Sequence, residues 1–243
     1  MEKEESTTKA IIVGATSGIG KELAEVLLRE GYVVGLAGRR ISLLEELKAK
    51  YSGRVFLKLI DVSQAADAMD ALDSLILEMA GVDVVVISSG VGFINKKLEW
   101  MREKETIDVN VSGFAAMSNV AMRYFLSRGS GHLVGISSIV AIRGGSAAPA
   151  YNASKAFVSN YLDGMRKKAA REGKLITVTD IQPGYVDTAM AKGNKFWVAS
   201  PREAAEEIYD AIKRKRKHAY VTRRWRLIAW LLKIMPDYFH NRI

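Results

Sequence analysis

Tyr151 and Lys155 carry the most specific chemistry in this sequence. They lie four residues apart in a stretch with a helical pattern, and residues four apart share one face of a helix. An isolated phenol titrates near pH ~10, and an adjacent ammonium group lowers the pKa of the phenol. Such a tyrosine can exchange a proton with a substrate oxygen at neutral pH. A Tyr-x-x-x-Lys pair alone is more often ordinary helix surface, so other motifs must support it.

Two other motifs give that support. Ser137-Ser138 ends a predicted strand upstream of the tyrosine, and a glycine-rich turn runs from Gly14 to Gly20 between the first predicted strand and helix. Glycines there let the backbone approach a pyrophosphate, and the helix N-terminus supplies unpaired N–H groups. The spacing, G-x-x-x-G-x-G, differs from the more familiar G-x-G-x-x-G, and a plain tight turn is the alternative. Its place directly after the first strand favours a dinucleotide site.

The elements that must position these motifs alternate between strand-like and helix-like runs. Predicted strands span Ala10–Val13, Tyr32–Ala37, Val55–Ile60, Val82–Ile87, His132–Ser137, Leu175–Ile181 and Ala219–Thr222. Predicted helices span Lys21–Glu30, Leu43–Tyr51, a run from a Ser63 cap to Ala80, Leu98–Arg128 with a break near Asn110, Tyr151–Gly173, and a run from Ser200-Pro201 to Lys217. This alternation predicts one α/β domain over residues 1–243, a doubly wound, Rossmann-type parallel sheet in three layers.

Composition excludes several classes of protein. The chain has 243 residues, of which 49% are hydrophobic and 26% charged, as in a packed globular protein. The absence of cysteine excludes disulfides, thiolate zinc sites and cysteine nucleophiles, and three scattered histidines argue against a metal site. A polar N-terminus and the lack of an apolar run of roughly 20 residues predict neither a signal peptide nor a membrane-spanning helix, hence a cytoplasmic protein.

These motifs, in this order, resemble those of the short-chain dehydrogenase/reductase family over roughly residues 9 to 222. The matching residues are the cofactor turn Gly14, Gly18 and Gly20, the adenine-contacting pair Asp61-Val62, the mid-helix Asn110, the catalytic Ser138, Tyr151 and Lys155, and the nicotinamide turn Pro183-Gly184 with Thr188. The resemblance implies further cofactor contacts at Thr16, Ser17, Ile19, Gly90 and Val186. It therefore implies an oxidoreductase that uses a nicotinamide cofactor.

The resemblance also implies a role for each catalytic position. Tyr151 would be the acid in carbonyl reduction or the base in alcohol oxidation, and Ser138 would stabilise charge on the substrate oxygen. Lys155 would lower the pKa of the tyrosine and bind the nicotinamide ribose, and Asn110 would hold a water that relays protons. Ser88-Ser89-Gly90 departs from the family's usual Asn-Ala-Gly. That change leaves the catalytic positions intact, so we expect an effect on local stability.

Cofactor choice is predicted from Gly38-Arg39-Arg40, at the end of the second strand. Relatives specific for NAD carry an acidic residue there, which binds the ribose hydroxyls. No carboxylate is present here to repel a 2′-phosphate, and the Arg39 guanidinium can clamp it. The alternative is two solvated arginines at a helix start, an unfavourable place for cations. The sequence therefore predicts NADP rather than NAD.

The predicted substrate pocket is apolar. Its expected walls are Val91–Phe93, Ile139–Gly145, Tyr185 and residues 190–198, with Phe93, Met190, Phe196 and Trp197 as the large apolar side chains and Arg143 as the one exception. We therefore expect a lipophilic carbonyl or alcohol substrate. Separately, we expect a homo-oligomer, either a dimer or a tetramer. Two other functions stay open: a non-catalytic regulator that binds NAD(P), and a nucleic-acid-binding module, for which no supporting motif is found.

The net charge of +9 comes from one C-terminal segment, because Lys213 to Lys233 holds nine basic residues and no acid. Arg223 to Met235 has a helical pattern that places Arg226, Ala229 and Lys233 on one face and leucines and isoleucines on the other. Such a basic amphipathic segment, within residues 223–243, fits a lid, a subunit contact or a peripheral membrane contact. We favour the apolar side being buried against protein near the pocket mouth.

Overall fold

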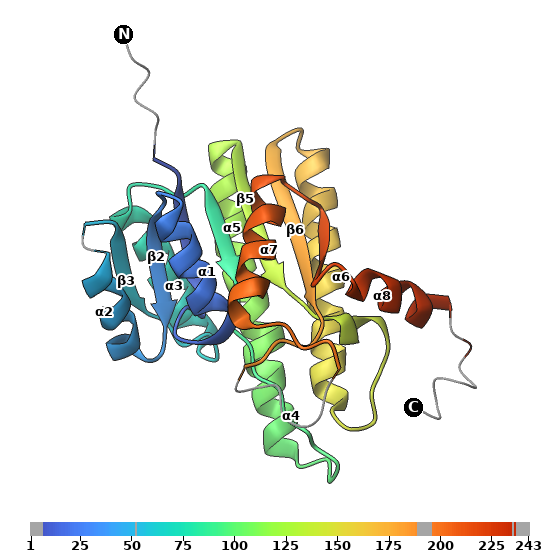
Figure 1. Cartoon of the computed structure of the whole chain (residues 1–243). Helices are drawn as coiled ribbons and strands as arrows, with labels where there is room; N and C mark the ends of the chain where they lie inside the picture. Colours follow the sequence, from blue (N-terminus) through green and yellow to red (C-terminus); the bar gives the residue numbers. More distant parts are fainter. Residues whose placement is uncertain (1–6, 52, 189–195, 235, 237–243) are drawn as a thin grey trace.

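A parallel seven-stranded sheet forms the centre of the computed structural model, which describes residues 7–51, 53–188, 196–234 and 236 (Figure 1). The strands are β1 (Lys9–Val13), β2 (Val33–Gly38), β3 (Val55–Leu59), β4 (Val84–Ile87), β5 (Ser130–Ile136), β6 (Leu175–Pro183) and β7 (His218–Val221). Their order is β3-β2-β1-β4-β5-β6-β7. The direction in which strands are added therefore reverses between β1 and β4, which opens a crevice at their carboxyl ends.

Helices cover both faces of the sheet (Figure 1). They are α1 (Gly18–Arg29), α2 (Ile41–Lys50), α3 (Ala65–Glu78), α4 (Trp100–Ile107), α5 (Phe114–Arg128), α6 (Pro149–Arg171), α7 (Pro201–Lys213) and α8 (Trp225–Ile234). Alternate residues of each strand face opposite layers, so Ile12 packs in the core under α1 and Ile11 in the core under α3 and α5. The predicted three-layer α/β domain with a doubly wound parallel sheet is confirmed.

Several predicted helix ends are wrong, and local hydrogen bonds explain them. Ser63 does not cap α3, because its N–H and hydroxyl both donate to the Asp61 carboxylate, and the helix begins two residues later, at Ala65. The capping box at Ser200 and Glu203 is present, but α7 ends at Lys213, before Lys215 turns the chain with a φ of +50°. The helix α1 begins at Gly18, earlier than Lys21, so its first N–H groups belong to the glycine turn.

The predicted break near Asn110 is a π-helical turn, η1 (Asp108–Gly113), that joins α4 to α5. Such a turn inserts one residue into a helix, and it often marks a functional site. Here it turns Asn110 inward, where the side chain is buried between the loop after β4 and α6.

The C-terminal helix α8 packs only one of its sides against the domain. Trp225 and Ala229 are buried against the short 3₁₀ helix η2 (Ile139–Ile142) and Tyr185, and the Arg143 Nε donates to the Leu232 carbonyl oxygen at 3.0 Å. The expectation that α8 buries the apolar side opposite Ala229 is therefore wrong, because Leu227, Leu231 and Ile234 are exposed and the small side chain of Ala229 lets α8 approach η2. None of the described helices is long and apolar enough to cross a membrane.

Candidate active site

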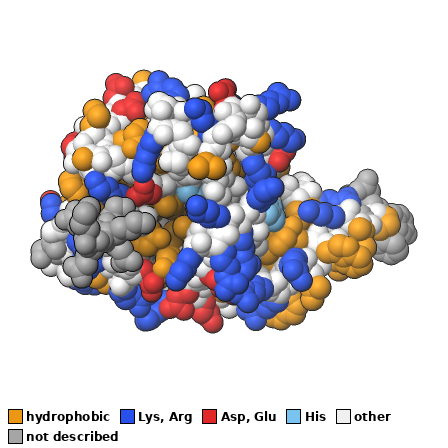
Figure 2. All heavy atoms as spheres, turned by 90° about the horizontal axis from the view of Figure 1, so that it is seen from above, with side chains coloured by type: hydrophobic (Ala, Val, Ile, Leu, Met, Phe, Trp, Pro, Cys, Tyr) orange, Lys and Arg blue, Asp and Glu red, His pale blue; other side chains and the backbone are white. Residues whose placement is uncertain are grey.

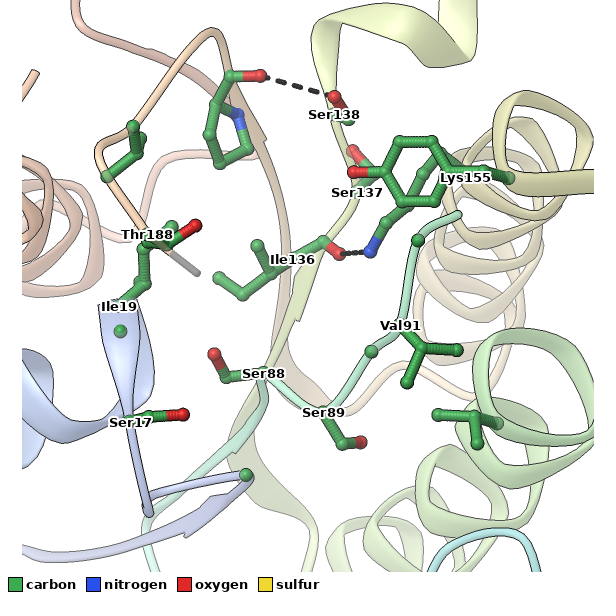
Figure 3. A pocket seen from close by; sticks show the side chains of 18 of the residues that line it. Ser17, Ile19, Ser88, Ser89, Val91, Ile136, Ser137, Ser138, Lys155 and Thr188 are labelled. Carbon is green, nitrogen blue, oxygen red and sulfur yellow. Dashed lines mark hydrogen bonds between the residues drawn. The ribbon is translucent and has the colours of Figure 1, made fainter. Parts of the chain in front are cut away.

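A cavity of about 1320 Å³ lies at the carboxyl ends of β1, β4, β5 and β6. Most of the predicted site residues line it: Gly14, Thr16, Ser17, Gly18, Ile19, Arg39, Asp61, Val62, Gly90, Ser138, Tyr151, Lys155, Pro183, Gly184, Val186 and Thr188. In Figure 3, side chains from the α1 turn, the β4 loop, the end of β5 and α6 surround one space. Gly20 and Asn110 lie just outside the lining and act by packing and hydrogen bonding.

The glycine turn brings backbone close to backbone. Gly14 has a φ of +96°, and a Cβ there would lie 2.5 Å from the Ser89 backbone nitrogen. A Cβ on Gly20 would lie 2.2 Å from the Gly14 carbonyl oxygen, so both positions exclude a side chain. The free N–H groups of the first turn of α1 border this part of the cavity, since α1 begins at Gly18. This is the arrangement that holds a pyrophosphate at a helix N-terminus.

Two arginines follow β2 at one end of the cavity. Both Arg39 and Arg40 line it, and no carboxylate stands at residues 38 to 40. Arg40 Nη2 donates to the Thr16 Oγ1 at 2.7 Å and to the Ser17 Oγ at 2.8 Å, so its guanidinium is held against the glycine turn. Only Arg39 was predicted as a site residue, and the structure adds Arg40 to the lining.

The three catalytic candidates meet at the other end of the cavity. Lys155 is buried on α6, and its Nζ lies 5.8 Å from the centre of the Tyr151 ring and donates to the Ile136 carbonyl oxygen at 3.0 Å (Figure 3). Ser138 follows β5, where its Oγ accepts from the Val140 backbone nitrogen at 3.3 Å and donates to the Pro183 carbonyl oxygen at 3.4 Å. The helical spacing and the strand end thus bring all three side chains to one place.

The protonation of this group differs from the expectation. Burial raises the pKa of the Tyr151 phenol, and a hydrogen bond with Ser138 only partly opposes that rise. Burial also lowers the pKa of Lys155 to about 8, against the opposing effect of the Asp180 carboxylate. The expected net lowering of the tyrosine pKa is not found, because the effect of burial is the larger one. Tyr151 is therefore a protonated phenol at neutral pH.

Asn110 ties the β4 loop to α6. Its Oδ1 accepts from the Val91 backbone nitrogen at 2.8 Å, and its Nδ2 donates to the Val91 carbonyl at 2.8 Å and to the Ser154 Oγ at 3.0 Å. A Cβ on the neighbouring Gly90 would lie 3.3 Å from the Asn110 Oδ1 and 3.4 Å from the Lys155 Nζ. The side chain is thus fully used in positioning, and the expected water relay stays a prediction.

The turn at Pro183-Gly184 packs against α8. A Cβ on Gly184 would lie 2.1 Å from the indole of Trp225, so only glycine fits beneath this ring. Trp225 also makes edge-to-face contacts with Tyr185 and Trp197, at centroid distances of 5.3 Å and 6.2 Å. The helix α8 therefore supports the wall of the cavity from behind.

The substrate walls are only partly as predicted. Val91, Gly92, Phe93, Ile139, Val140 and Tyr185 line the cavity. Phe196 and Trp197 do not, because they stack around Trp225 and remain exposed, and Met190 lies outside the described residues. Arg102 and Glu105 of α4 add charged side chains that the sequence analysis missed. Arg143, which was expected to be the one charged side chain in the pocket wall, instead donates a hydrogen bond to α8.

Comparison with known proteins places this site in a family. The family model for short chain dehydrogenases matches residues 8–199, most of the chain. The chain belongs to the short-chain dehydrogenase family. An uncharacterized oxidoreductase of Myxococcus xanthus is 34% identical over 246 residues, covering 96% of this chain and 95% of the relative. An uncharacterized oxidoreductase of Staphylococcus epidermidis is 30% identical over 205 residues, covering 84% and 88%.

Solved structures are similar to this short-chain dehydrogenase over most of its length. An alcohol dehydrogenase from Thermococcus sibiricus, complexed with 5-hydroxy-NADP, has a TM-score of 0.78 and 25% identity over 88% of this chain and 96% of its own. ElxO with NADP bound has a TM-score of 0.78 at 18% identity, with the same coverage. A 3-ketoacyl-(acyl-carrier-protein) reductase from Brucella melitensis, complexed with NADH, has a TM-score of 0.79 at 20% identity, covering 88% and 95%. These likenesses confirm the fold that the motifs indicated.

A buried carboxylate behind the active site of this short-chain dehydrogenase was missed. Asp180 on β6 accepts hydrogen bonds from Ser137, directly after β5, and from Ser159, one helical turn after Lys155 on α6. The His218 Nδ1 lies 3.3 Å from the Asp180 Oδ2. These bonds lower the pKa of Asp180 despite burial, so the carboxylate stays charged beneath the ammonium of Lys155. An aspartate inside a predicted buried strand was the available signal.

Proposed function

We propose that this protein reduces a carbonyl compound with NADPH, or oxidises the corresponding secondary alcohol with NADP. The observation that carries the proposal is the convergence of Ser138, Tyr151 and Lys155 at one end of a cavity whose other end holds a glycine turn and two arginines. A reacting carbonyl needs a proton donor and a charge-stabilising hydroxyl at one point, and a dinucleotide must reach that point from its phosphates.

The cavity fits a dinucleotide by its own construction. Gly14 and Gly20 leave no room for a Cβ beside the first backbone N–H groups of α1, which suits a pyrophosphate. Asp61 and Val62 border the adenine end, and Thr188 and Gly184 border the nicotinamide end. When bound, the cofactor would supply the hydride.

The protein's own groups would move the proton. Tyr151 stays protonated at neutral pH because burial raises its pKa, which suits the acid in carbonyl reduction. Ser138 would donate to the carbonyl oxygen as negative charge develops there. Lys155, with a pKa of about 8, would place a positive charge next to the phenol at neutral pH and favour the loss of its proton.

NADP is the proposed cofactor because two cations and no carboxylate follow β2. Arg39 and the fixed guanidinium of Arg40 would both bind a 2′-phosphate, where an acidic residue would repel it. The NADP of the ElxO and Thermococcus sibiricus structures supports this choice, whereas the NADH of the Brucella melitensis reductase shows that the fold alone does not decide it.

The proposed substrate is lipophilic, because Val91, Phe93, Ile139 and Val140 supply apolar walls beside Tyr151. A test follows NADPH oxidation against a panel of ketones, aldehydes and quinones, with the Tyr151→Phe variant as the matched control. Turnover that the variant lacks supports the proposal. Tight NADPH binding with no turnover of any carbonyl would instead favour the non-catalytic regulator.

A further inference from the structure

The helix α8 exposes a side that a folded protein would normally cover. Leu227, Trp230, Leu231 and Ile234 form this outward face, with exposures of 67%, 63%, 44% and 56%. The opposite side of α8 is already packed on η2 and Tyr185. In Figure 1 the helix extends from the domain, and Figure 2 shows hydrophobic side chains beside basic ones at the same end. A helix that is apolar on both sides is stable in water only when its outer side also finds a cover.

Among the described residues of α8, the charged side chains are all positive. Arg226 and Lys233 are exposed on α8, and within the described part of the chain neither forms an ion pair. Arg223, in contrast, lies 3.4 Å from the Asp210 carboxylate of α7, and Arg224 lies over the Trp197 ring at 5.6 Å. The two arginines before α8 thus have partners within the domain, whereas the two cations beside the outward face are available to bind an anionic partner.

We propose that the outward face of α8 binds an anionic lipid surface. The leucines, isoleucine and tryptophan would enter the boundary between headgroups and acyl chains, and Arg226 and Lys233 would lie among the negative headgroups. Trp230 suits this position because an indole combines an apolar ring with a polar N–H. A helix of ten residues lies along such a surface and does not span it.

A second copy of this chain fits the face less well. A stable dimer buries roughly 20–30 residues on each side, whereas the outward face offers four large side chains. Two copies meeting through α8 would also bring Arg226 and Lys233 of each close to those of the other, which is a like-charge contact. An anionic surface complements the same cations.

This inference goes beyond the proposed function, because lipid binding needs neither cofactor nor turnover. The full chain is sedimented with phosphatidylglycerol–phosphatidylcholine vesicles and with phosphatidylcholine vesicles, at low and high salt. We expect binding to the first only, weakened by salt. The double variant Arg226→Gln/Lys233→Gln should bind roughly 30-fold more weakly, from two charges near the surface. Its control, Lys48→Gln/Lys50→Gln, removes two exposed cations of α2 and should bind normally.

The apolar contribution is tested separately. Leu227→Gln/Leu231→Gln should reduce binding at least about tenfold, since both side chains would leave the lipid. Leu77→Gln/Leu175→Gln is the control, because these leucines are exposed on α3 and β6. A blue shift of tryptophan emission on vesicle binding should disappear in Trp230→Phe, while binding persists. Circular dichroism and NADPH affinity verify that each variant is folded.

Two results would overturn the inference. The first is wild-type protein that stays in the supernatant with anionic vesicles. The second is binding that the α8 variants and their controls share, which would place the lipid contact elsewhere. If vesicles are not bound and Leu227→Gln/Leu231→Gln converts an oligomer into monomers by sedimentation velocity, the outward face is an interface between copies. Loss of catalysis in Tyr151→Phe leaves all of these readings unchanged.

Discussion

At the glycine-turn end of the cavity, backbone approaches backbone closely. Gly14, Gly18 and Gly20 remove side chains there, and strand ends and a helix N-terminus supply the surface. At the other end, the proposed catalytic end, the side chains of Ser138, Tyr151 and Lys155 line the cavity, and their proposed roles depend on their functional groups. Substitutions at the glycine turn should therefore change both the stability of the protein and its affinity for the cofactor. Substitutions at the proposed catalytic end should change turnover alone.

The largest effect should come from removing one hydroxyl at the catalytic end. Tyr151→Phe keeps the ring and its packing but deletes the proposed acid, so kcat should fall on the order of 10³-fold. The affinity for NADPH, measured by calorimetry, should stay the same. A variant that keeps more than about a tenth of the wild-type rate would show that another group supplies the proton.

At the turn, adding one methyl group should destabilise the protein. Gly14→Ala would place a Cβ against the Ser89 backbone at a positive φ, and we expect a loss of about 3 kcal/mol in unfolding free energy. The matched control is Gly164→Ala on α6, where no atom lies within 4 Å and helix propensity should add about 0.5–1 kcal/mol. Urea denaturation measures both, and equal stabilities would contradict the close backbone approach.

The two arginines should separate the cofactors. Arg39→Ala should weaken NADPH binding by about 1.5–3 kcal/mol and leave NADH nearly unchanged, since only NADPH carries the 2′-phosphate. Arg40→Ala should weaken both, because Thr16 and Ser17 also lose their hydrogen bonds to the guanidinium. Titration calorimetry with each cofactor decides, and equal losses for both cofactors in Arg39→Ala would exclude its role in specificity.

The smallest effect should be a pH dependence at the catalytic end. The pKa of Lys155 is about 8, so its positive charge is present below pH 8 and is lost above it. We expect kcat/KM for carbonyl reduction to be level below about pH 8 and to fall roughly tenfold per pH unit above it. Lys155→Arg keeps its charge and should lose this limb of the profile. An unchanged limb in that variant would assign the titration to another group.

The motifs that were predictable from the sequence are local ones. Tyr151 and Lys155 share a helix face by spacing alone, and the glycine turn occupies seven consecutive residues. The parallel sheet with a helix layer on each face follows from the alternation of strands and helices. Each of these features depends on residues that are close together in the sequence, so the spacing of residue types predicts it.

What the sequence did not predict depends on partners far along the chain. Asp180 is held by Ser137 and Ser159, and the Tyr151 pKa is set by burial that no spacing reveals. Phe196 and Trp197 pack on Trp225 instead of lining the cavity, because a distant helix offered them an aromatic surface. The side of α8 that is buried was wrongly assigned for the same reason.

The π-helical turn η1 fixes the rotational phase of two helices. A helix advances by about 100° and 1.5 Å per residue, so one extra residue within η1 sets how α5 is rotated relative to α4. Removing a single residue there would restore a regular helix and rotate either Arg102 and Glu105 out of the cavity wall or Phe114 and Phe125 out of the core. A change in the length of this helix should therefore be more disruptive than a substitution at one of its exposed positions.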